Sequence, residues 1–180
     1  MLTITVPGQE SWDSVKEEFV TTKEQTLELE HSLLSVSKWE SKWNKSFLSC
    51  KDMTNEQSLD YIRCMTIGKV QDDNVYYALS QAQVNKIKDY INAPMTATTF
   101  NKRQNGPKSR EVVTSELIYY WMISLQIPFE CQKWHLNRLL TLIEVCNVKQ
   151  TPPKKMKFAD MANQRRALNA SRRKANNSRG

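Results

Sequence analysis

The spacing of apolar residues changes near residue 32, and this change constrains the fold more than any other feature of the chain. Residues 2–6 alternate apolar and polar side chains up to Pro7-Gly8, which is the pattern of a strand followed by a turn. Residues 19–21 and 26–30 are two further candidate strands. A sheet of this size needs helices to cover it. The first 30 residues therefore predict a small N-terminal sheet that is covered by the helices that follow.

Beyond residue 32, apolar side chains recur every three or four positions, which is the period of one helix face. The first such run extends from Leu33 to Phe47. Two further helices are expected near residues 55–66 and after Ser80, because each follows a capping box, in which a Ser or Thr precedes a Gln by three positions. Pro94 ends the second of these helices. The capping pairs are Thr54 with Gln57 and Ser80 with Gln83.

Two more helices are expected beyond residues 96–111, a polar segment that contains Gly106-Pro107 and is typical of an exposed loop. Residues 114–125 are apolar nearly all round, which predicts a central helix, and residues 131–146 predict another buried helix. With only 4 Gly and 6 Pro, the composition does not favour a turn-dense all-β fold. The predicted fold class is α+β and mostly α, with a small N-terminal β-sheet followed by a bundle of about five helices and a basic C-terminal tail.

The net charge of +7 is concentrated at the C-terminal end of the chain. Nine basic residues and one acidic residue follow residue 150, so this segment carries +8 and the first 150 residues sum to −1. Thr151-Pro152-Pro153 excludes a helix locally and predicts an extended linker. We therefore expect a globular domain over residues 1–150 and a basic tail over 151–180. The tail has helical spacing over residues 158–168, enough for a short helix.

The cysteines and histidines are not arranged as metal ligands. The four cysteines form no C-x-x-C pair, and the two histidines are far apart, so no zinc site is predicted. We see no charged-then-apolar leader and no stretch of about 18 apolar residues, so we expect no membrane contact. Free thiols in a reducing cytoplasm are the expected state of Cys50, Cys64, Cys131 and Cys146.

No catalytic residue, cofactor site or metal site is predicted. Cys131 and His135 lie four residues apart on one helix face, as a nucleophilic pair would, but no oxyanion site accompanies them. We interpret His135 as a structural histidine with satisfied hydrogen bonds. The chain has no Gly-rich phosphate loop. Four carboxylates beside apolar helix stripes are interpreted as ordinary surface residues: Glu40, Asp60, Glu116 and Glu144.

Three features have both a structural and a functional interpretation, which the sequence leaves open. Trp39 and Trp43 lie together on a helix, either as a core seam or as an exposed docking patch for a protein. The basic loop at 101–110 is either solvated or a recognition loop. The tail either solubilises the chain, docks on an acidic protein or contacts nucleic acid. Phe158 is the one aromatic residue of the tail, which weakens a base-stacking role.

Several distinctive runs are spread over almost the whole chain: residues 29–33, 37–43, 60–66, 94–98, 118–122, 127–139 and 165–169, with Arg172-Arg173. Trp134-His135-Leu136-Asn137-Arg138 belongs to the most distinctive of them. Through these runs the chain resembles a known family, the tail assembly chaperones of long-tailed bacteriophages.

The resemblance implies a non-catalytic protein that uses no cofactor. Such chaperones coat the tape measure protein and keep it soluble until the tail tube protein polymerises around it. The partners implied are therefore the tape measure protein and the tail tube protein. The implied location is the host cytoplasm, and the mature virion would lack the chaperone. A homo-oligomer and a weak nucleic-acid contact through the basic tail are compatible with this role.

The candidate partner-binding residues are aromatic residues that escape the core and basic residues of the loop and tail. An alternative function is a phage structural or nucleic-acid-binding protein at the head–tail junction that uses its basic tail. The candidate residues are Trp39, Trp43, Trp121, Trp134, Lys102, Arg103, Arg165, Arg166, Arg172 and Arg173.

Overall fold

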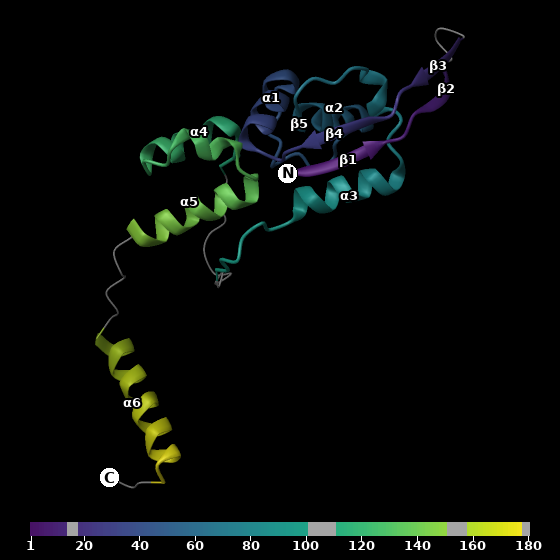
Figure 1. Ribbon diagram of the computed structural model, residues 1–180. Coiled ribbons are helices and arrows are strands. Elements are labelled where there is room, and N and C mark those ends of the chain that lie inside the picture. The colour runs from purple at the N-terminus through teal and green to yellow at the C-terminus, as the bar shows by residue number, and fades with distance from the viewer. Residues whose placement is uncertain (14–17, 101–110, 151–157, 178–180) are drawn as a thin grey trace. The chain divides into compact units, whose positions relative to one another are not determined.

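A computed structural model of the chain describes residues 1–13, 18–100, 111–150 and 158–177 (Figure 1). For residues 9–13, 18–22 and 158–160 it describes the backbone alone. The chain forms two units, Met1–Asn147 and Val148–Gly180. The fold class is α+β and mostly α, which confirms the prediction from the sequence. The expected loop at 101–110 and the expected linker at 151–157 lie outside the described residues.

The sheet of the first unit is built from the first and third predicted strands and one strand that was not predicted. β1 (Leu2–Val6) pairs antiparallel with β4 (Gln25–Leu29), with Leu2 opposite Leu29. β5 (Thr66–Ile67) pairs with the other side of β4. Ile4, Val6, Leu27 and Leu29 alternate with exposed residues and are buried, as the period of two requires.

The second predicted strand lies in a different sheet from the one expected. Residues 19–21 fall in β3 (Glu18–Thr22), which pairs with β2 (Gln9–Asp13) in a two-stranded sheet of its own. Two strands this close in sequence pair locally as a hairpin, which leaves β4 free to continue the main sheet. The prediction that all three segments belong to one sheet was therefore wrong for residues 19–21, which pair in a separate sheet.

α1 (Leu33–Trp43) confirms the first predicted helix but ends before Phe47. Ser32 caps its N-terminus, and its hydroxyl accepts a hydrogen bond from the backbone N–H of Ser35. At its C-terminus Asn44 adopts a left-handed backbone with φ 51°, which stops the helix. Apolar periodicity continues to Phe47 in the sequence, but the backbone conformation at Asn44 decides where the helix ends.

α2 (Asn55–Met65) and α3 (Gln81–Asn92) begin where the capping boxes predicted. In both boxes the hydroxyl and the glutamine side chain each pair with the other residue's backbone N–H. A short 3-10 helix, η1 (Asp73–Tyr76), lies between them and was not predicted. Figure 1 shows α3 running along β1, and the Gln83 side chain donates a hydrogen bond to the Thr5 carbonyl. The core therefore forms between the sheet and these helices.

α4 (Ser115–Ser124) corrects the prediction of a helix buried on all sides. Ile118 and Met122 are fully buried, but Tyr120 is 63% exposed and Ile123 is 62% exposed. α4 packs against α1, and its buried residues Ser115, Ile118 and Met122 share one face of the helix. A helix with apolar residues all round does not reveal from its sequence which face its neighbours will cover.

α5 (Leu136–Gln150) begins five residues later than the predicted helix at 131–146. Residues Phe129–Lys133 form a 3-10 helix, η2, and Trp134 is extended. The His31 carbonyl accepts the Leu136 N–H at 2.7 Å, and Ser32 forms an isolated bridge with His135. These contacts with a distant segment hold Trp134 and His135 in a non-helical path, so the helix starts only at Leu136.

α6 (Phe158–Ala175) forms in the second unit and is longer than the predicted 158–168. Among residues 161–175 every side chain is exposed except Ala162, which is half-buried. Arg172, Arg173 and Lys174 occupy its last turn, where positive charge favours the negative end of the helix dipole. The helix extends past Leu168 because the residues that follow are compatible with helix and carry this favourable charge.

Candidate protein-binding surface

The two histidines meet inside the first unit, with ring centroids 5.0 Å apart. His31 is 2% exposed, and its Nδ1 forms a hydrogen bond with the Tyr61 hydroxyl. The Nε2 of His135 pairs with the Tyr90 carbonyl, and its Nδ1 accepts the Asn137 N–H, which together fit the neutral tautomer with hydrogen on Nε2. Burial lowers the pKa of His31 to about 3 and also lowers the pKa of His135. Both rings are therefore neutral near pH 7 and hold the structure together.

Cys131 is buried, and this burial raises the pKa of its thiol. A nucleophilic cysteine needs a thiolate, which a raised pKa disfavours near neutral pH. His135, the other member of the proposed pair, already uses both ring nitrogens in hydrogen bonds. The geometry therefore supports structural roles for both side chains.

Glu40 and Asp60 are not surface residues, which corrects the interpretation from the sequence. Glu40 is 7% exposed, and its two oxygens accept the backbone N–H groups of Phe47 at 2.8 Å and Ser115 at 2.7 Å. Asp60 is 5% exposed, pairs with the Lys42 ammonium and accepts the Trp43 indole N–H at 2.8 Å. Both carboxylates are thus committed to partners within the fold.

The four candidate tryptophans differ in their access to a partner. Trp39 is fully buried, and its indole N–H donates to the Gln57 carbonyl at 2.9 Å, so its candidacy as a partner-binding residue was wrong. Its companion Trp43 is half-buried, and the two rings lie 6.4 Å apart as part of a core seam. Trp121 is also half-buried. Trp134 is half-buried beneath the Arg138 guanidinium, which lies 4.3 Å from the ring centroid.

A groove of about 590 Å³ lies between α2, η1 and the end of α1. The Arg63 guanidinium stacks over Tyr76 at 5.3 Å and over Tyr77 at 5.4 Å. Trp43 and Asp60 also line the groove. Asp60 is already paired with Lys42 and Trp43, whereas the buried Nε of Arg63 has no hydrogen-bond partner among the described residues.

α4 carries an exposed, mostly apolar surface that the sequence did not single out. We call it the α4 stripe, and it consists of Glu116, Tyr120 and Ile123, three exposed residues spaced by four and three positions. This spacing places them on one face of α4. Tyr119, half-buried beside them, lies 6.4 Å from the ring of Phe129, which is 52% exposed. The spacing was visible in the sequence, but the apolar residues on the other faces of α4 obscured it.

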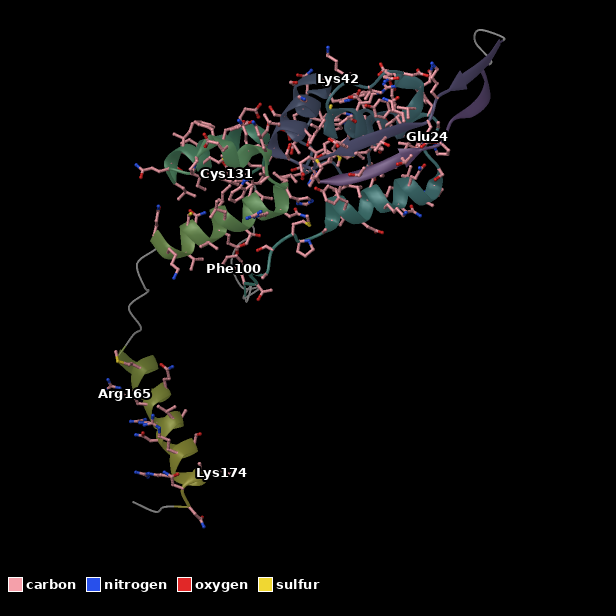
Figure 2. The ribbon with its side chains drawn as sticks, viewed as in Figure 1. Glu24, Lys42, Phe100, Cys131, Arg165 and Lys174 are labelled. Atoms are coloured by element: carbon pink, nitrogen blue, oxygen red, sulfur yellow. The ribbon has the colours of Figure 1, made fainter. Side chains whose placement is uncertain are left out.

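The basic candidates of the tail lie on α6, and those of the loop lie outside the described residues. Arg165, Arg166, Arg172 and Arg173 are all exposed, and Figure 2 shows side chains standing out from α6, those of Arg165 and Lys174 among them. Lys102 and Arg103 belong to the segment that the structure does not describe. The structure therefore supports accessibility for the tail arginines and leaves the loop as a prediction.

By fold, the chain belongs to the α+β class, with an exposed helical stripe and a basic helix as its accessible features. No protein-family model, curated protein or solved structure matches the chain. Among the described residues, no group of three or more His, Cys, Asp or Glu side chains is placed to hold a metal ion. Within the same residues, no helix combines the length and the apolar character needed to cross a membrane.

Proposed function

We propose that the chain is a non-catalytic phage tail assembly chaperone that binds the tape measure protein and promotes assembly of the tail tube. The observation that carries the proposal is the α4 stripe, because large apolar side chains exposed along one helix face are typical of a surface that receives another helix. The sequence resemblance supplies the identity of the client, a long and largely helical protein. The host cytoplasm is the proposed place of action.

The energetics of the stripe favour a weak site that is repeated many times. Burying the exposed half of Tyr120 and Ile123, and of Phe129 beside the stripe, contributes on the order of 2–5 kcal/mol, from about 1.5–3 kcal/mol for a fully buried side chain. Association costs at least about 4 kcal/mol in lost translational and rotational freedom. One stripe therefore holds a client helix only weakly, and coating depends on many copies along one polymer. A weak contact also allows tail tube subunits to displace the chaperone.

The proposal that the chain is not an enzyme is supported by how its ionisable groups are used. The buried carboxylates accept backbone, indole or ammonium hydrogens. Both histidines are neutral and hydrogen-bonded, and the Cys131 thiol has a raised pKa. Hydrogen bonds within the fold explain why the carboxylates and histidines are buried, so their burial does not require a catalytic role.

Co-expression with the tape measure protein tests this function. We expect the wild-type chain to raise the soluble fraction of the tape measure protein several-fold, and a variant carrying Tyr120→Ser with Ile123→Ser to lose most of that effect, because two anchors are removed. The soluble fraction is measured by quantitative blotting after centrifugation. Tyr77→Ser is the matched control, since Tyr77 is 70% exposed but lies outside the stripe. A double variant as effective as the wild type would contradict the proposed surface.

A second candidate is a structural or nucleic-acid-binding protein at the head–tail junction. The exposed arginines of α6 favour it, because Lys and Arg side chains on one polar segment attract any polyanion. Mass spectrometry of purified particles separates the two functions, since a junction protein is retained in virions and a transient chaperone is not.

A further inference from the structure

The exposed face of α6 carries a seven-residue repeat. Met161, Leu168 and Ala175 recur at intervals of seven, and Arg165 and Arg172 stand between them, giving a spacing of four and three throughout. Met161 is 36% exposed and Leu168 is 51% exposed. Such spacing brings these side chains onto one face, which is the arrangement by which a helix meets another helix. We call this face the α6 seam.

The α4 stripe has the same spacing and complementary chemistry. Glu116, Tyr120 and Ile123 also alternate by four and three, and they put one acidic residue beside two apolar ones. Backbone hydrogen bonding at the start of α4 lowers the pKa of the Glu116 carboxyl, so this residue is charged near neutral pH. A second exposed acid, Glu130, directly follows Phe129 in the sequence. The stripe therefore fits a helix that presents apolar residues flanked by arginine.

We propose that the α6 seam of one copy docks on the α4 stripe of a second copy of this chain. Seven residues of helix span roughly 10.5 Å on both sides, so the two repeats match in length. Leu168 then packs on Tyr120 and Ile123, and an arginine of the seam lies opposite Glu116. The centre of the interface is apolar, and opposite charges meet at its edge.

The charge pattern favours the α4 stripe, and not a second α6, as the surface to which the α6 seam binds. Two α6 seams placed together would set Arg165 and Arg172 of each helix against like charges, which is unfavourable. The α4 stripe offers the Glu116 carboxylate instead. Because each copy brings one seam and one stripe, a single contact between two copies is heterologous and leaves one free surface of each kind. Copies therefore associate head to tail.

Docking would cover the stripe while no client is bound. It uses the surface assigned above to the tape measure protein, but it does not depend on that function, because only copies of this chain take part. A client helix that binds the stripe competes with α6, so client binding and self-association exclude one another. Covered apolar side chains are also less prone to nonspecific aggregation.

Complementation between two variants tests the proposal by sedimentation velocity of the nuclease-treated full chain over a dilution series. The weight-average molar mass of the wild type should rise continuously with concentration. Leu168→Asp destroys the seam and Ile123→Asp destroys the stripe, so each alone should associate at least about tenfold more weakly. Mixed together, the two variants retain one intact seam and one intact stripe, and we expect dimers that grow no further.

Ala170→Asp is the matched control, because it adds the same charge on the opposite side of α6 and should leave association unchanged. Thermal unfolding checks that each variant is folded, and Tyr120→Asp is a second stripe variant. The proposal is overturned by a wild type that is monomeric at every concentration, by equal effects of Ala170→Asp and Leu168→Asp, or by a mixture that does not dimerise. Since no client is present, these outcomes are independent of the co-expression result.

Discussion

His31 shows how one buried residue ties three segments of the chain together. Its ring contacts Tyr61 of α2 and the ring of His135, while its carbonyl accepts the Leu136 N–H at the start of α5. A neutral imidazole fits this site, whereas a charged one would lose its hydration without gaining a counter-ion. The residue therefore makes the fold sensitive to protonation.

The free energy of unfolding should fall as pH drops from about 6.5 toward 3. The folded-state pKa of His31 is about 3 and its ordinary value is 6.5, so in this range the unfolded state binds the proton more readily. At pH 5, about 1.5 pH units below the ordinary pKa of histidine, the free energy of unfolding is lower by about 2 kcal/mol than at neutral pH. Urea unfolding of the wild type at pH 7.5 and pH 5 measures it.

His31→Gln is the variant that isolates this contribution. It removes the titrating ring but keeps a side chain that accepts or donates hydrogen bonds. We expect a lower stability at both pH values and a pH dependence that is smaller by about 2 kcal/mol, the contribution of one group. An unchanged difference between pH 7.5 and pH 5 in this variant would assign the acid sensitivity to other groups.

At the scale of elements, Glu40 connects parts of the chain that the sequence treats as separate. It lies on α1 and accepts hydrogens from Phe47, just after the helix, and from Ser115, the first residue of α4. A carboxylate at the start of a helix also interacts favourably with the helix dipole. One side chain thus closes the turn after α1 and positions α4, with its exposed stripe.

Glu40→Gln should destabilise the fold by about 2 kcal/mol or more. The amide keeps one acceptor oxygen and turns an NH₂ group toward a backbone N–H, so one buried donor loses its partner. Glu56→Gln is the matched control, because Glu56 also lies on a helix but is exposed, and it should change stability by less than about 1 kcal/mol. Equal unfolding midpoints in urea for the two variants would show that the hydrogen bonds of Glu40 contribute little.

At the scale of the whole molecule, the net charge and the buried apolar core lie in different parts of the chain. The first 150 residues are nearly neutral and contain the core and the α4 stripe, whereas the last 30 carry a net charge of +8. The second unit contributes exposed side chains from α6 and no buried apolar residue among those described. Binding of polyanions is therefore expected to respond to substitutions in the last 30 residues, and binding of a client helix to substitutions in the α4 stripe.

Changing Arg165, Arg166, Arg172 and Arg173 to Gln in the full chain should weaken any DNA binding and flatten its dependence on salt. Each arginine that no longer neutralises a phosphate is expected to reduce the slope of log affinity against log salt by about 0.9. Fluorescence anisotropy with duplex DNA across a salt series measures both effects. DNA binding that persists unchanged in this variant would show that the tail arginines do not bind the DNA.

The sequence by itself determined the local features of this protein. Strands at 2–6 and 26–30 follow from alternation, and the starts of α2 and α3 follow from capping boxes, because both signals involve residues only a few positions apart. The basic tail helix follows from composition and spacing in the same way. These features could be read without knowing which segments meet.

Tertiary structure alone decided the features that depend on distant neighbours. The pairing of β5 with β4, the late start of α5 and the burial of Glu40 all rest on contacts between segments far apart in the chain. The same is true of the candidate surface, since α4 is apolar on every side and only its packing against α1 leaves Tyr120 and Ile123 exposed. Local spacing sets which residues share a helix face, but only the packed neighbours determine which face remains open to a partner.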